Sequence, residues 1–133
     1  MAEAHVLFVC LHGAAKSVIA AAHFQRLANE RGLRADATFA GTEPDTEIAP
    51  RVITELLAQG ADVQGLRPRL VTSADVASAS RIVTFGCDIA ALNPAVPVER
   101  WDDVPAVSDG YAAAREAIEA RVTRLVDELT QKR

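Results

Sequence analysis

The sequence predicts a single α/β domain over residues 1–133: a three-layer, doubly wound fold in which a four-stranded parallel sheet has helices on both faces. The length suits one domain, and half of the residues are hydrophobic, enough for one sizeable core. Strand-like runs alternate with segments of helical period, an order typical of a parallel sheet with crossover helices. No repeat, low-complexity tract or linker divides the chain.

Four segments have the pattern of strands. The first, HVLFV, is a continuous apolar run, as expected of a strand that is buried on both faces. The second ends at Gly41, and the third, RIVTF, is rich in β-branched and aromatic residues. The predicted strands cover residues 5–9, 36–40, 81–85 and 96–101.

The helices are predicted from their periodicity and from the residues at their ends. Gly32 and Gly60 follow two of them and can end a helix, whereas Thr72 and Ser108 are suitable N-caps. The last helix is the clearest, because apolar residues recur on one face: Tyr111, Ile118, Val122, Leu125 and Leu129. The predicted helices cover 17–31, 48–59 and 108–129, with one or two further turns at 72–77.

Composition narrows the cellular setting and the partners. The net charge is −4 and no run of Lys or Arg stands out, which argues against nucleic acid or an acidic membrane as a partner. Two distant cysteines make no disulfide framework, and no CxxC or HxxxH spacing predicts a zinc site. No apolar stretch approaches the ~20 residues of a membrane helix, and no signal-peptide pattern begins the chain. We therefore expect a cytoplasmic protein with free thiols.

The segment between the first strand and the first helix, residues 10–17 (CLHGAAKS), is the predicted site and is called the Cys10 loop below. Ligands of parallel sheets bind beyond the C-terminal strand ends. The loop amides can form a nest for an anion, and the following helix N-terminus adds positive charge. Both effects favour the reactive thiolate of Cys10, to which Ser17 can donate a hydrogen bond. The predicted oxyanion-binding residues are Leu11, His12, Gly13, Ala14, Ala15 and Lys16.

A family resemblance supports this interpretation. The run 6–10 (VLFVC), with Ser17 seven positions after the cysteine, resembles the low-molecular-weight protein tyrosine phosphatases and the related arsenate reductases. The stretches 40–44 (AGTEP), 48–60 and 83–87 (VTFGC) are similar to the arsenate reductase branch, so that the resemblance covers nearly the whole chain. It implies a four-stranded parallel sheet, a phosphate, arsenate or phosphorylated substrate, and a thiophosphate or thioarsenate intermediate on Cys10.

The chain departs from the family pattern at three positions. Lys16 replaces the loop Arg, so a single compact charge stands in place of a planar fork. Gly13 replaces the usual Asn, which keeps the turn but loses a brace. The general-acid Asp of the family falls at Ala106, and the nearby Asp103 is our candidate for that role, with Asp102 beside it.

Cys87 matches the second, resolving cysteine of the arsenate reductases. The resemblance implies that it attacks Cys10, forms a disulfide and releases arsenite. The place of a third cysteine falls near Asn93, so an external thiol such as thioredoxin or a small thiol would have to reduce that disulfide. No other cofactor and no metal is predicted. A plain packing role for Cys87 also fits the sequence.

Other interpretations of the Cys10 loop remain open. Cys10 can be an inert core residue before an ordinary turn. A non-catalytic phosphate or phosphoprotein binder fits the changes at Lys16 and Ala106, whereas keeping Cys10 and Ser17 favours chemistry. A metal site of Cys10, His12 and Cys87 lacks a spacing signature. A nucleotide-binding loop needs glycines where Cys10 and Ala15 stand.

Overall fold

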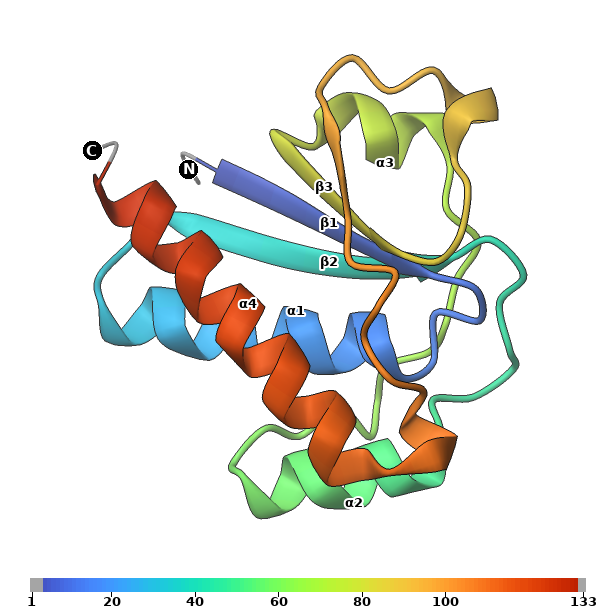
Figure 1. The fold of residues 1–133 in the computed structure, drawn as a ribbon, viewed down its shortest axis with the longest axis vertical. Helices are drawn as coiled ribbons and strands as arrows, with labels where there is room; N and C mark the ends of the chain where they lie inside the picture. Colours follow the sequence, from blue (N-terminus) through green and yellow to red (C-terminus); the bar gives the residue numbers. More distant parts are fainter. Residues whose placement is uncertain (1–3, 132–133) are drawn as a thin grey trace.

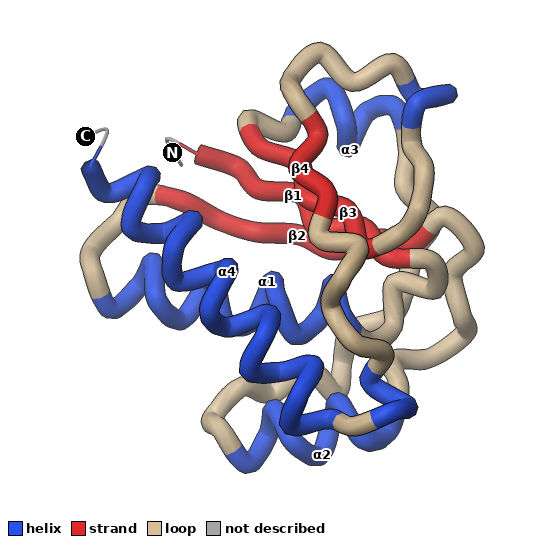
Figure 2. The backbone as a smooth tube through the Cα atoms, viewed as in Figure 1, coloured by secondary structure: helices blue, strands red, loops and turns tan. Residues whose placement is uncertain are grey.

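The computed structural model describes residues 4–131, and over that range it contains one four-stranded sheet. The strands pair in the order β2-β1-β3-β4, and every pair is parallel. The four strands are the red segments of Figure 2. In this register Cys10 lies beside Gly41 on one side and Phe85 on the other, so three strands end at one edge. The strands are β1 (Ala4–Cys10), β2 (Ala35–Gly41), β3 (Arg81–Phe85) and β4 (Val98–Arg100).

Helices cover both faces of the sheet, which confirms the predicted fold class (Figure 1). Three of them pack on one face: α1 (Lys16–Glu30), α2 (Pro50–Ala58) and α4 (Tyr111–Gln131). On the opposite face lies α3 (Ser73–Ser78), together with the short 3₁₀ turn η1 (Ala90–Leu92). A second 3₁₀ turn, η2 (Val107–Asp109), leads into α4.

The central strand β1 explains why its sequence is continuously apolar. Phe8 and Cys10 point into the core beneath α1 and α4, whereas Leu7 and Val9 point into the smaller core beneath α3. Because both faces are covered, neither set of side chains meets water. Phe8 also contacts the ring of Trp101, at 6.0 Å between centroids, which ties the residue after β4 to the main core.

The ends of the helices agree in part with those predicted from the sequence. Thr72 caps α3 in a full capping box with Asp75, as its position predicted. Ser108 was the wrong N-cap for α4, because Val107–Asp109 form a separate 3₁₀ turn and the helix begins at Tyr111, after Gly110. The start of α2 also lies later than predicted, at Pro50, whose missing N–H suits the first helical position.

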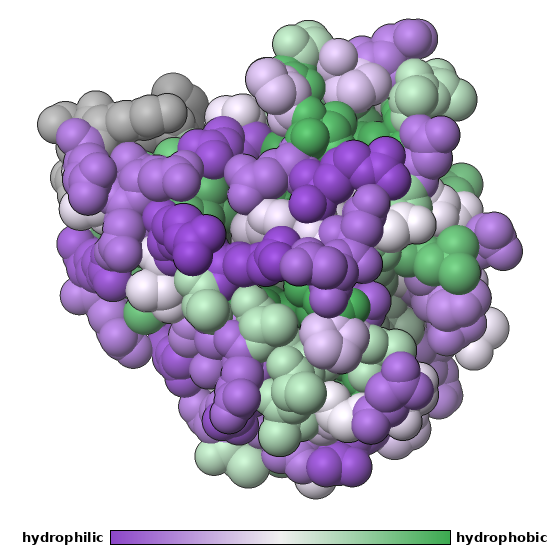
Figure 3. All heavy atoms as spheres, in the orientation of Figure 1, coloured by the Kyte–Doolittle hydropathy of each residue, from purple (hydrophilic) through white to green (hydrophobic). Residues whose placement is uncertain are grey.

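Hydrophilic side chains cover most of the molecular face in Figure 3. Within residues 4–131, no helix is long and apolar enough to span a membrane.

Candidate functional site

Cys10 ends β1 at the base of the Cys10 loop, with only 6% of its surface exposed. Its Sγ lies 3.0 Å from Oγ of Ser17, which is fully buried in the first turn of α1. A hydroxyl at this distance can donate to a thiolate. The strand, loop and helix therefore bring the two predicted residues together, as the sequence led us to expect.

The backbone of the Cys10 loop turns its amides toward one side. Its carbonyls accept hydrogen bonds from the neighbouring segment 42–49, and in a trans peptide the N–H points away from the C=O of the same plane. The amides of residues 11, 12, 13 and 15 therefore face away from that segment. Within the described range 4–131, no N–H of residues 11–16 donates a hydrogen bond. The four hydrogen bonds to the loop carbonyls run from the N–H of Thr42 to Cys10 (3.3 Å), of Glu43 to Leu11 (2.7 Å), of Asp45 to His12 (3.1 Å) and of Ala49 to Ala14 (3.0 Å).

Two glycines allow the loop to pack this closely against β2. Gly13 has φ +58°, and a Cβ there would lie 2.7 Å from the backbone N of Gly41. A Cβ on Gly41 would in turn lie 2.6 Å from the backbone N of Gly13. Backbone atoms cannot rotate out of the way as side chains can. Gly13 therefore does more than keep the turn, because any side chain there, Asn included, would force the backbone of the loop or of β2 to shift.

A cleft of about 590 Å³ opens over Cys10. The Cys10 loop lines it through all of the predicted oxyanion-binding residues except Gly13, whose side is packed against β2. The walls come from segments 45–51 and 106–108 and from Phe85 at the end of β3. Apart from a few polar and charged groups, the lining is apolar.

Lys16 lines the cleft, but its ammonium is partly engaged. Nζ donates to the carbonyl oxygen of Val104 at 3.1 Å, across a sequence separation of 88 residues. Lys16 thus ties the start of α1 to the segment after β4. The charge remains near the cleft, while one of its three N–H donors already has a protein partner.

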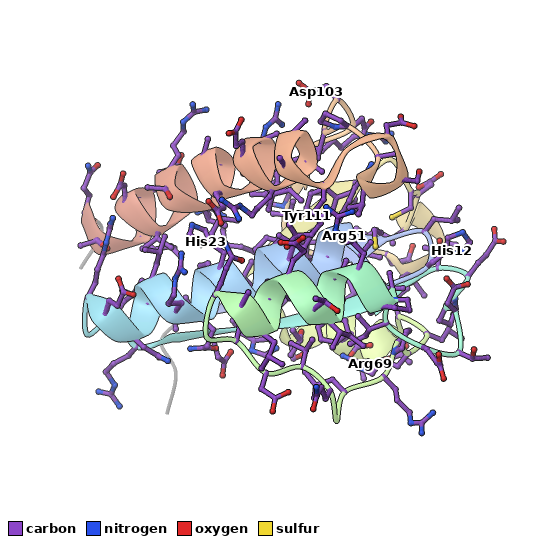
Figure 4. The ribbon with its side chains drawn as sticks, turned by 90° about the horizontal axis from the view of Figure 1, so that it is seen from below. His12, His23, Arg51, Arg69, Asp103 and Tyr111 are labelled. Atoms are coloured by element: carbon purple, nitrogen blue, oxygen red, sulfur yellow. The ribbon has the colours of Figure 1, made fainter. Side chains whose placement is uncertain are left out.

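The structure does not bring Asp103 to the cleft. Its carboxylate is 73% exposed and pairs with Arg121, 2.6 Å away, at the outer edge of the molecule in Figure 4. Asp102 pairs with Arg100, which lowers the pKa of that carboxyl, and accepts from the Gly86 N–H at 2.9 Å. Ala106, where the resemblance noted above would place the family's acid, does line the cleft.

Cys87 lies at the same sheet edge as Cys10 but in the other layer of side chains. Both thiols are free, and Cys87 packs in the core beneath α3. Its Sγ donates to the carbonyl of Val9 at 3.4 Å. Burial raises the pKa of the Cys87 thiol above its ordinary value. Gly86, with φ +81°, interrupts the alternation of β3 and directs Cys87 to this layer.

The structure also shows polar cleft residues that the sequence did not single out. Arg51, in the first turn of α2, lines the cleft, and its guanidinium lies 5.5 Å from the ring centroid of Tyr111 (Figure 4). Asp45 lines it too and lies 3.6 Å from Nδ1 of His12, which donates to the Glu43 carbonyl at 3.0 Å. Each comes from a segment whose approach to the Cys10 loop depends on the tertiary fold. Within residues 4–131, no cluster of three or more His, Cys, Asp or Glu could hold a metal.

This fold and loop define a class of protein. The family model described as "Low molecular weight phosphotyrosine protein phosphatase" matches residues 5–104, from β1 to just beyond β4. The chain therefore belongs to this family, and the resemblance noted in the sequence is confirmed.

Individual relatives include arsenate reductases. A curated protein of Halobacterium salinarum, named "Putative arsenate reductase", is 28% identical over 127 residues and covers 91% of this chain and 89% of its own length. The structure of the thioredoxin-dependent arsenate reductase Cg_ArsC1' of Corynebacterium glutamicum has a TM-score of 0.82 and is 24% identical in sequence. The match covers 99% of this chain and 64% of that protein. YfkJ of Bacillus subtilis has a TM-score of 0.86 at 20% identity and covers 100% of this chain and 98% of its own. The two structures show the shared fold.

Proposed function

We propose that this chain is a cysteine-dependent enzyme that holds phosphate or arsenate in the Cys10 loop and attacks it with the Cys10 thiolate. The carrying observation is that the amides of residues 11–16 have no hydrogen-bond partner in the described part of the chain, next to a thiol that lies 3.0 Å from the Ser17 hydroxyl. Amides held toward one side by the segment 42–49 need no reorganisation to bind an anion. Family membership supports the same chemistry.

With a phosphate ester, Cys10 Sγ attacks phosphorus, the S–P bond forms and the P–O bond to the leaving group breaks. Water then attacks phosphorus, which releases phosphate and returns the thiolate. A general acid contributes on the order of 10²–10⁴-fold by protonating the leaving oxygen. Ala106 cannot do so, and Asp103 faces Arg121. We therefore infer that esters with weakly basic leaving groups, which need no proton, are the better substrates.

With arsenate, Cys10 displaces water from arsenic and forms an S–As bond. Cys87 then attacks Cys10 Sγ; the S–S bond forms, the S–As electron pair passes to arsenic, As(V) becomes As(III), and arsenite leaves. An external thiol reductant such as thioredoxin or a small thiol restores both cysteines. The relative from Halobacterium salinarum supports this branch. Cys87 must leave the core beneath α3 for this step, and the turn at Gly86 is the natural pivot.

Three variants test these reactions together. We expect Cys10→Ser to abolish both aryl phosphate turnover and arsenate-dependent oxidation of a dithiol. Cys87→Ser should abolish only the arsenate reaction, and Ser17→Ala should slow both. Aryl phosphate or arsenate turnover that survives in Cys10→Ser, with the fold intact by circular dichroism, would remove Cys10 from the chemistry.

A second function, non-catalytic binding of phosphate or a phosphoprotein, is favoured by the engaged ammonium of Lys16 and by Ala106. A binder would retain phosphate affinity in Cys10→Ser and show no turnover in the wild type. The double variant Lys16→Arg/Ala106→Asp separates the alternatives further. If it gains aryl phosphate turnover from an inactive wild type, the site is a weakened phosphatase site that now binds only.

A further inference from the structure

We infer that Arg51 binds a second anionic group, carried by the organic part of the molecule whose phosphate reaches Cys10. The inference rests on the proposed function, because it takes the Cys10 loop as the binding place of the reacting phosphate. Its substrate class is a phosphate ester that also bears a carboxylate or a second phosphate. Arg51 would then select the substrate, while the loop amides hold the reacting group.

The cleft has room for a ligand larger than a bare oxyanion. If each oxygen takes roughly the 30 Å³ of a water molecule, a four-oxygen anion fills about 120 Å³. The cleft holds about 590 Å³, several times that volume. Its remaining lining is mainly apolar, from residues such as Leu11, Phe85 and Val107, and this suits a hydrocarbon or aromatic body. The cleft can thus hold a reacting phosphate that is one end of an organic molecule.

The Arg51 head group is held in place and still has free donors. Nε donates to Glu55 at 2.9 Å, one turn further along α2, and the guanidinium lies over the buried ring of Tyr111. These two contacts favour one orientation of the guanidinium. Within residues 4–131, neither terminal nitrogen has a hydrogen-bond partner. These two nitrogens form the edge that binds carboxylate and phosphate oxygens in pairs.

Arg51 and Cys10 differ in how far they are exposed to solvent. The Arg51 side chain is 66% exposed, whereas Cys10 is 6% exposed at the cleft floor. Arg51 therefore lies at the solvent-exposed mouth of the cleft, whereas the thiol of Cys10 lies at its floor. Among the described residues, the only acidic side chain lining the cleft is Asp45, which lies beside His12. Although Glu55 offsets part of its charge through Nε, Arg51 still presents two cationic N–H groups at the mouth for an anionic group.

Calorimetric titration with three probes tests this assignment: inorganic phosphate, benzylphosphonate and 4-carboxybenzylphosphonate. Phosphonates are not hydrolysed, so binding is measured without chemistry. In the wild type we expect the carboxylated probe to bind about tenfold more tightly than benzylphosphonate, the size of one charge-assisted hydrogen-bonded contact. Arg51→Gln should remove this preference and leave inorganic phosphate within about twofold, and Arg51→Lys should keep part of it. Arg67→Gln, at an exposed arginine outside the cleft, makes the same charge change and should match the wild type.

Each other outcome overturns the inference in a recognisable way. A preference that is absent from the wild type, or that survives in Arg51→Gln, removes Arg51 as the selecting residue. Equal weakening of all three probes in Arg51→Gln would mean that Arg51 binds the reacting anion itself. If inorganic phosphate does not bind the wild type at all, the proposed function fails first, and the inference fails with it.

Discussion

The close approach of Gly13 to Gly41 gives a prediction whose size follows from the structure. Gly13→Ala places a methyl group 2.7 Å from the backbone N of Gly41 and 2.9 Å from the backbone C of Ala40. It also forces a side chain onto a residue with φ +58°. Gly32→Ala is the matched control, because Gly32 has φ +64° but nothing lies within 4 Å of the added methyl group.

The contact of the added methyl group and the positive φ each contribute to the loss of stability, and the two contributions can be estimated separately. The left-handed conformation costs a non-glycine residue about 1–2 kcal/mol, and both variants carry this cost. Overpacking against an immobile neighbour costs a further ~1–3 kcal/mol, and only Gly13→Ala carries it. We therefore expect Gly13→Ala to lower the free energy of unfolding by roughly 2–5 kcal/mol and Gly32→Ala by roughly 1–2 kcal/mol. Gly13→Ala should also lose phosphate affinity, because the loop amides are displaced.

Urea denaturation of the three proteins measures the stability difference, and the rise of Tm with added phosphate measures binding. Gly32→Ala should keep the wild-type rise in Tm, and Gly13→Ala should lose it. If Gly13→Ala is no less stable than Gly32→Ala and keeps phosphate-dependent stabilisation, the packing of the Cys10 loop against β2 does not shape the site.

Three further predictions concern single contacts. Lys16→Met removes the donor to the Val104 carbonyl and a cation from the cleft. We expect weaker phosphate binding by calorimetry and a loss of about 1 kcal/mol in the free energy of unfolding. Unchanged phosphate affinity would mean that Lys16 only ties the two segments together. Burial raises the pKa of Cys87, so its thiolate forms at higher pH than in an ordinary cysteine. Under mild oxidation, the Cys10–Cys87 disulfide should therefore form faster as pH rises beyond about 8.5. Peptide mapping that gives a rate independent of pH would contradict this. The hydrogen bond from Arg69 lowers the pKa of Asp75, whose carboxylate completes the capping box of α3, so Asp75→Asn should cost about 1 kcal/mol at neutral pH. Thermal melts should show this difference above pH ~4 and lose it as pH falls through the lowered pKa, whereas a constant difference would place the effect elsewhere.

The sequence predicted the strand, loop and helix of the site because its signals there are local. The apolar run of β1, the glycine at 13 and the serine at 17 lie within about a dozen positions of one another, and their geometry follows from neighbouring residues. Ala106, where the resemblance placed the general acid, also lines the cleft, although whether it corresponds to that acid stays a prediction.

The polar residues of the cleft depend on the tertiary fold and had no local signal. Arg51 is one of many surface arginines in the sequence, and only the packing of α2 beside α4 brings it to the cleft and over Tyr111. Asp103 is near Ala106 in sequence, yet Arg121 of α4 holds it at the outer edge. The positive φ of Gly86, which directs Cys87 to the other layer, is likewise invisible in the residue pattern of β3.

The central claim is that the backbone amides of residues 11–16 hold an oxyanion over Cys10. Titration of the ¹⁵N-labelled protein with inorganic phosphate, followed by two-dimensional NMR, tests it amide by amide. We predict saturable shifts concentrated in the amides of residues 11–16, with arsenate giving the same pattern and chloride at equal ionic strength giving none. Shifts that leave these amides unmoved while other residues respond, or no saturable shift at all, would contradict the account.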